Sequence, residues 1–145
     1  MEQGVDIRVR GLVKRYRSST VNAVDGIDLD VRHGEFLGLL GPNGAGKTSL
    51  ISIITGARRA TEGSVRILER DIVAQPDGVH AAIGLVPQDI ALYEMLTARE
   101  NLAFFGRLHG LDAKAIRGRS DQLLRRAGLH ERADERISRW SGGMQ

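Results

Sequence analysis

The chain has 145 residues, of which 41% are hydrophobic and 27% are charged, the composition of an ordinary globular domain in water. Lysine and arginine number 21 against 18 aspartates and glutamates, so the formal net charge is +3. The sequence contains no cysteine, which excludes disulfide frameworks and thiolate metal sites.

Neither a membrane segment nor a nucleic-acid surface is predicted. Residues 1–6 lack the basic-then-apolar order of a signal peptide, and the apolar run at residues 36–40 is too short to cross a bilayer. Many arginines fall between Arg107 and Arg139, in segments of helical pattern, where a solvated helix face explains them better than a nucleic-acid surface. Any association with a membrane is therefore expected to come through a partner protein.

The first part of the chain has the patterns of strands. Residues 7–10 and 27–31 alternate apolar and polar side chains, which predicts two half-buried antiparallel strands. Residues 36–40 are apolar without alternation, the pattern of a strand buried on both faces. Residues 64–68 and 83–86 predict two further strands, the second of them buried and ended by a proline.

Residues 41–48 carry the pattern of a loop that binds polyphosphate. Gly41 and Gly46 enclose four residues and are followed by Lys47 and Thr48. Glycine lets backbone N–H groups turn toward a phosphate because no Cβ atom stands in the way. The lysine places a positive charge beside the β- and γ-phosphates, and the threonine hydroxyl is a ligand for the accompanying Mg²⁺.

The residues after this loop favour the same interpretation. Leu50, Ile53 and Ile54 share one face of a predicted helix, which Gly56 is expected to end. A buried strand, a glycine loop and then a helix form the context in which such a loop binds nucleotide. The helix N-terminus adds about half a positive charge near the phosphates.

From residue 97 onward the pattern becomes helical. Thr97 and Glu100 predict a capping box, in which the hydroxyl and the carboxylate each bond an otherwise unpaired backbone N–H. Asp112 is expected to cap a second helix. The residues predicted to face inward are Leu102, Phe105 and Leu108 in the first helix, which Gly110 ends, and Ile116, Leu123, Leu124 and Ala127 in the second, which precedes Gly128.

Three further features give the chain a family resemblance. Ser141, Gly142 and Gly143 follow the helical region, Gln88 follows a predicted buried strand, and Tyr16 follows the first strand. With the phosphate loop, these residues stand in the order of motifs in the ATP-binding cassette (ABC) family, which the chain resembles over essentially its whole length. In that family the motifs are an aromatic A-loop, the phosphate loop, a Q-loop glutamine, a helical subdomain and a signature motif. Trp140 and Met144 depart from the commoner signature spelling Leu-Ser-Gly-Gly-Gln.

The resemblance implies a role for each motif. The A-loop ring stacks on adenine, the Q-loop glutamine reaches Mg²⁺ and the attacking water, and the signature meets the γ-phosphate held by the opposite subunit. Stacking reads no hydrogen-bond pattern, so we expect only a weak preference for ATP over GTP. The predicted nucleotide-binding residues are Tyr16, Gly41, Asn43, Gly44, Ala45, Gly46, Lys47, Thr48 and Ser49; the signature contacts are Ser141, Gly142 and Gly143; the Mg²⁺ contacts are Thr48 and Gln88.

The expected fold is α/β, that of a P-loop NTPase of the ABC ATPase type. We expect an antiparallel β subdomain, part of a parallel core sheet and a helical subdomain. Residues 1–145 are predicted to form a single ABC ATPase domain, with the nucleotide-binding sheet core at 1–90, the helical subdomain at 91–140 and the start of the signature motif at 141–145.

The acidic catalytic motif of the family is absent from the sequence. No apolar run followed by Asp-Glu occurs, and no histidine follows the signature, so no catalytic residue is assigned. We therefore expect the N-terminal part of a longer protein, truncated before the acidic catalytic strand. A strand at 36–40 that lacks this neighbour is expected to have an exposed apolar edge, which is an aggregation hazard.

Residues 83–89 and 96–102 look most like the ATPases of bacterial efflux systems with separate membrane subunits, such as antibiotic-resistance exporters. The resemblance implies a subunit that binds MgATP and dimerises head to tail with a second ATPase subunit. In the complete protein it would hydrolyse ATP at the cytoplasmic face of the membrane and drive a transmembrane partner. The chain alone is expected to bind nucleotide without sustained turnover.

Two alternatives stay open at this point: a cassette ATPase of DNA repair or translation, and an inert, unstable fragment. A small kinase is disfavoured because it would not explain Gln88 and the serine–glycine motif at their places in the sequence.

Overall fold

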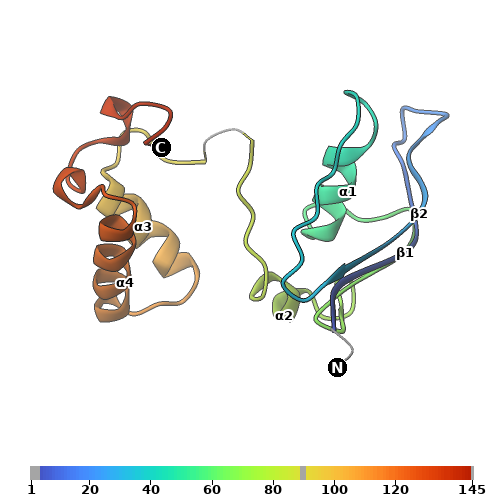
Figure 1. Ribbon diagram of the computed structural model, residues 1–145, viewed down its shortest axis with the longest axis horizontal. Helices are drawn as coiled ribbons and strands as arrows, with labels where there is room; N and C mark the ends of the chain where they lie inside the picture. The colour runs from blue at the N-terminus through green and yellow to red at the C-terminus, as the bar shows by residue number, and fades with distance from the viewer. Residues whose placement is uncertain (1–3, 89–90, 145) are drawn as a thin grey trace. The chain divides into compact units, whose positions relative to one another are not determined.

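The computed structural model describes residues 4–88 and 91–144 and divides the chain into two compact units, Met1–Leu85 and Val86–Gln145 (Figure 1). The boundary predicted from the sequence, after residue 90, stays a prediction. The first unit contains β1 (Val5–Arg15), β2 (Asn22–Arg32), α1 (Lys47–Ile54), β3 (Glu62–Ile67), β4 (Arg70–Asp71) and α2 (Pro76–His80).

A four-stranded antiparallel sheet in the order β2-β1-β3-β4 forms one layer of the first unit. Val9 in the central strand β1 lies opposite Leu29 of β2 and Val65 of β3. The antiparallel pairing of β1 with β2, predicted from the alternating pattern, is confirmed. Alternate side chains enter the core because successive residues of a strand point to opposite faces. The core they form with α1 and α2 consists of Val9, Leu12, Val24, Leu50, Ile53, Val65, Ile67 and Val79.

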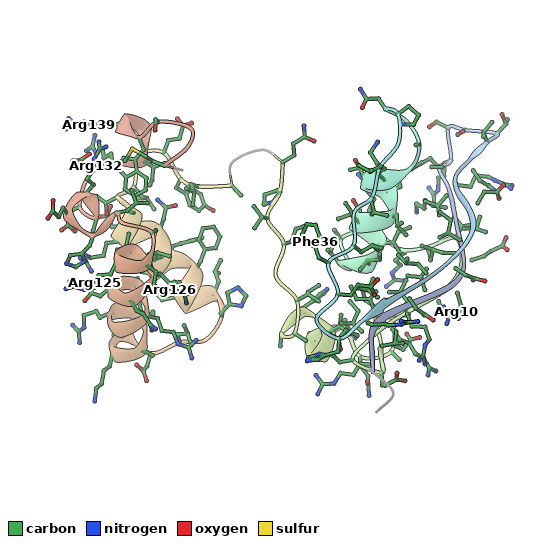
Figure 2. The ribbon with its side chains drawn as sticks, in the orientation of Figure 1. Arg10, Phe36, Arg125, Arg126, Arg132 and Arg139 are labelled. Carbon is green, nitrogen blue, oxygen red and sulfur yellow. The ribbon has the colours of Figure 1, made fainter. Side chains whose placement is uncertain are left out.

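Polar side chains cross-link the strands outside this core. The Arg10 guanidinium, labelled in Figure 2, donates a hydrogen bond of 2.6 Å to the Asp30 carboxylate on the neighbouring strand. This bond lowers the pKa of the Asp30 carboxyl below its ordinary value. Because both side chains are exposed, the pair contributes little to the stability of the fold.

The two buried strands predicted at residues 36–40 and 83–86 are not formed, and this prediction is wrong. Both segments are coil; Phe36 is 98% exposed, Leu40 96% and Val86 94% (Figure 2 labels Phe36). A strand of this kind needs neighbours on its edges and a layer on each face. The described strands of the first unit pair only with one another, so these segments have no ladder to join.

Helix α1 has the bounds and the buried face that its sequence predicts. It begins at Lys47, directly after Gly46, and is followed by Gly56 with a φ of 76°. Leu50 is 4% exposed and Ile53 is 2% exposed, because both lie on the face that packs against the sheet. The glycine after the helix adopts the left-handed conformation that ends many helices, as predicted.

The second unit is helical, with α3 (Ala98–Leu108), α4 (Ala113–Arg126) and two short 3₁₀ turns, η1 (His130–Arg132) and η2 (Ile137–Arg139) (Figure 1). Both predicted caps are confirmed. The Glu100 N–H donates to the Thr97 hydroxyl at 3.1 Å, and the Thr97 N–H donates to the Glu100 carboxylate at 2.8 Å. Asp112 accepts a bond of 2.7 Å from the Ala115 N–H at the start of α4.

The core of this second unit differs in part from the predicted one. It is built from Ala98, Leu124, Ala133, Ile137 and Trp140. Three residues predicted to face inward are exposed instead: Leu108 by 68%, Leu123 by 50%, and also Ala127. Leu123 precedes the buried Leu124, and adjacent helical residues point about 100° apart, so only one of them faces the core. Leu108 is the last residue of α3 and lies at the exposed end of the helix.

A buried asparagine joins α3 to the segment before it. The Asn101 side chain is 2% exposed. It accepts a bond of 2.8 Å from the Tyr93 N–H and donates bonds of 3.0 Å each to the carbonyls of Tyr93 and Thr97. Three bonds satisfy an amide that would otherwise be costly to bury.

Candidate nucleotide-binding site

The phosphate loop joins the coil at 36–40 to α1 and adopts backbone conformations that favour glycine. Gly41, Gly44 and Gly46 have φ values of 151°, 85° and 86°. At Gly46 a second requirement is added, because a Cβ atom there would lie well inside 3.0 Å of the Ala23 carbonyl oxygen in β2. The loop–helix junction is therefore pressed against the sheet, and only glycine fits at this point.

Lys47 folds back over the loop. Its ammonium group donates hydrogen bonds of 2.7 Å to the carbonyl oxygens of Gly41 and Pro42. A further bond of 3.2 Å, from the Ala45 N–H to the Pro42 carbonyl, closes a turn within the loop. These bonds hold a positive charge across the mouth of the loop, at the place where phosphate oxygens would accept it.

The start of α1 offers backbone donors to a bound anion. No side chain caps this N-terminus, and no acidic residue occupies the first turn. The unpaired N–H groups and the helix dipole both favour negative charge there. Thr48 in the same turn is exposed, so its hydroxyl is accessible to a metal ion bound with the phosphates.

Tyr16, predicted to bind the base, lies beside α1. Its hydroxyl oxygen is 2.9 Å from the Ser49 hydroxyl oxygen in the first turn of the helix. The Lys14 ammonium and the Arg58 guanidinium stand 5.3 and 5.7 Å from the centroid of its ring. Sequence reasoning missed Lys14 and Arg58, because no motif marks two cations that meet a ring only through the fold.

The residues predicted as the Q-loop and the signature belong to the second unit, so their role at the phosphate loop stays a prediction. Gln88 is exposed, and its neighbours Asp89 and Ile90 lie outside the described residues. Ser141, Gly142 and Gly143 form an exposed turn, which a bond of 2.9 Å from the Met144 N–H to the Ser141 carbonyl closes. Gln145, the last residue of the predicted signature segment, also lies outside the described residues.

No cluster of three or more His, Asp or Glu side chains able to hold a metal ion is found in the part of the chain that the structure describes. Mg²⁺ that accompanies a nucleotide takes hydroxyl and phosphate oxygens as ligands. The Thr48 hydroxyl fits that role.

No helix within residues 4–88 and 91–144 is long and apolar enough to cross a membrane.

Comparison with known proteins places this site in a family. The family model described as "ABC transporter" matches residues 24–145. The chain belongs to the ABC transporter family. Its α/β fold, with an antiparallel sheet and a helical unit, is that of the ABC ATPase domain. A dimeric ATP-binding cassette, MJ0796, solved in a post-hydrolysis state with ADP and phosphate, is similar to it with a TM-score of 0.77 and 28% identity, over 95% of this chain and 64% of that one.

Relatives of known role in this ABC family include drug-resistance proteins. The daunorubicin resistance ATP-binding protein DrrA3 of Streptomyces coeruleorubidus is 42% identical over 139 residues, which are 96% of this chain and 43% of DrrA3. The doxorubicin resistance ATP-binding protein DrrA of Mycobacterium tuberculosis is 39% identical over 137 residues, which are 94% of this chain and 41% of DrrA. The chain thus spans less than half the length of either relative.

Proposed function

We propose that this chain is part of the ATP-binding subunit of an ABC exporter, and that its first unit binds MgATP. The observation that carries the proposal is the geometry of the phosphate loop: three glycines with positive φ, an ammonium group across the loop and an uncapped helix start. Each element contributes positive potential or an N–H donor in the same place. The resemblance to drug-resistance ATP-binding proteins supports the exporter assignment.

In this proposal the nucleotide lies along α1. The β- and γ-phosphates accept hydrogen bonds from the N–H groups of residues 43–48. Lys47 exchanges its carbonyl partners for phosphate oxygens. Ser49, which follows Thr48 in the first turn of α1, is a further proposed contact of the nucleotide. Tyr16 takes the adenine. Mg²⁺ supplies charge neutralisation at the phosphates, and Thr48 and Gln88 are its proposed protein contacts.

The proposed assembly of the complete protein pairs two ATPase subunits head to tail. Ser141, Gly142 and Gly143 then meet the nucleotide of the opposite subunit, and their exposure is compatible with such a contact. The pair would act at the cytoplasmic face of the membrane on a transmembrane subunit that forms the translocation path. For these 145 residues, which contain no apolar run ending in Asp-Glu, we propose nucleotide binding without sustained hydrolysis.

Thermal unfolding of the 145-residue chain with and without MgATP tests the proposal. A ligand that binds only the folded state stabilises it by about 2.7 kcal/mol at a hundred times its dissociation constant, so the midpoint should rise. Lys47→Ala should lose this rise, while Lys114→Ala, which removes the same charge from an exposed position on α4, should keep it. An equal rise in the wild type and Lys47→Ala would contradict the site assignment. Lys47-dependent, sustained ATP hydrolysis would contradict the absence of turnover.

A further inference from the structure

Three side chains from separate segments contact Tyr16. The Ser49 hydroxyl bonds its hydroxyl at 2.9 Å, and the cations of Lys14 and Arg58 stand 5.3 and 5.7 Å from the ring centroid. Tyr16 and Ser49 are both half-buried, so their hydroxyls are partly shielded from water. A phenol ring with a bonded hydroxyl and cations near the ring has little freedom to turn.

The backbone around Tyr16 is held as well. The Ser19 N–H donates to the Tyr16 carbonyl at 2.9 Å, which closes a tight turn after β1. The Lys14 ammonium donates to the Arg59 carbonyl at 2.6 Å, so the end of β1 is tied to the segment that follows α1. Since the Gly46–Ala23 contact presses the start of α1 against β2, the ring and the helix start have a fixed relation.

This relation matters for recognition of a base. A base that stacks on a mobile ring must order that ring when it binds, and the ordering weakens affinity. A ring held beforehand avoids this cost, and it also fixes the distance between the base and the phosphates. The Ser49 hydroxyl is suited to this task because it comes from the first turn of the phosphate-loop helix itself.

We infer that Ser49 and Arg58 are positioning residues for base recognition: Ser49 ties the Tyr16 hydroxyl to α1, and Arg58 steadies the ring. The inference rests on the proposed function, in which Tyr16 takes the base of MgATP. Neither residue needs to touch the base for this role. Their contribution as positioning residues should appear only in the part of the affinity that depends on the base.

The test compares the affinities of the 145-residue chain for MgATP and for magnesium tripolyphosphate, which carries phosphates without a base. The dissociation constant for tripolyphosphate divided by that for MgATP gives a ratio that reports the contribution of the base. Direct effects of Ser49 on phosphate binding change both constants alike and cancel in this ratio. Tyr16→Phe and Ser49→Ala should each reduce this ratio by about three- to tenfold, the range for one hydrogen bond. The double variant should lose no more than either single variant, and Ser49→Thr should restore the ratio.

Additive losses in the double variant, or an unchanged ratio in both single variants, would overturn the role of Ser49. Arg58→Gln should reduce the ratio by about two- to fivefold, the range for an exposed cation–π contact. Arg59→Gln is the matched control, because it removes the same charge from the adjacent residue. An equal effect of both arginine variants would mean that the overall positive charge, and not the contact of Arg58 with the ring, changes the ratio. That result would overturn the role of Arg58.

Tyr16→Ala separates this inference from the proposed function. If Tyr16→Ala leaves the ratio unchanged, Tyr16 does not take the base, and the proposed function loses that contact. If Tyr16→Ala reduces the ratio while Tyr16→Phe and Ser49→Ala leave it unchanged, only the inference fails. Thermal unfolding of each variant without ligand shows whether it folds; Tyr16→Phe keeps the ring and serves if Ser49→Ala does not fold.

Discussion

The steric demand at Gly46 gives the sharpest test of the phosphate-loop geometry. Gly46→Ala places a Cβ atom well inside 3.0 Å of the Ala23 carbonyl oxygen, and the residue has a φ of 86°. The left-handed conformation costs about 1–2 kcal/mol for a residue with a side chain. Overpacking adds about 1–3 kcal/mol, because Ala23 is part of a paired strand and cannot move freely. We expect a loss of about 2–5 kcal/mol in the free energy of unfolding of the first unit.

Gly44→Ala is the matched control for this prediction. Its φ of 85° is almost identical, but a Cβ atom at Gly44 would have no neighbour within 4 Å. It should therefore cost only the backbone strain, about 1–2 kcal/mol. Urea unfolding followed by far-UV circular dichroism measures both costs, while fluorescence of the single tryptophan, Trp140, follows the second unit separately. Equal losses for the two variants would refute the close contact with Ala23.

Three further predictions concern the second unit. Thr97→Ala removes the capping box of α3 and should lower the free energy of unfolding by about 1 kcal/mol, measured by urea unfolding through Trp140 fluorescence; a change below the error of the method would contradict it. Asn101→Leu leaves the Tyr93 N–H without its bond and should cost roughly 1–3 kcal/mol in the same assay. The hydrogen bond to Arg99 lowers the pKa of the Asp121 carboxyl below its ordinary value of 3.8, so the unfolded state binds its proton first. The contribution of this hydrogen bond to the free energy of unfolding should be present above pH 3.8 and lost as the pH falls through the lowered pKa. When the free energy of unfolding is measured against pH, it should fall less steeply with acid in Asp121→Asn than in the wild type.

The predictions that the structure confirms depend on residues that are close together in the sequence. The helix after the loop, its glycine stop, the capping box of α3 and the cap of α4 each depend on residues within four or five positions of one another. Their geometry is set by hydrogen bonds along one stretch of backbone, which a sequence displays directly. The alternating strands β1 and β2 also follow from local patterning, since successive side chains of a strand point to opposite faces of the sheet.

The predictions that failed depend on partners distant in the sequence. Residues 36–40 and 83–86 have strand composition, yet a buried strand exists only where other strands pair with it. Leu108 and Leu123 satisfy helical periodicity, but burial requires a neighbour over that part of the face. The contact of Arg58 with Tyr16 could not be predicted from the sequence either, because it forms where the segment after α1 returns toward the end of β1.

The phosphate loop combines both kinds of determinant. Its turn and the bonds of the Lys47 ammonium are local, and the motif encodes them. The contact of Gly46 with Ala23 and the bond between Tyr16 and Ser49 come from β2 and from the turn after β1, which the motif does not contain. A peptide of residues 41–56 would therefore have the motif without the two attachments that orient it. The contacts that orient the loop thus come from the antiparallel sheet and from the turn after β1.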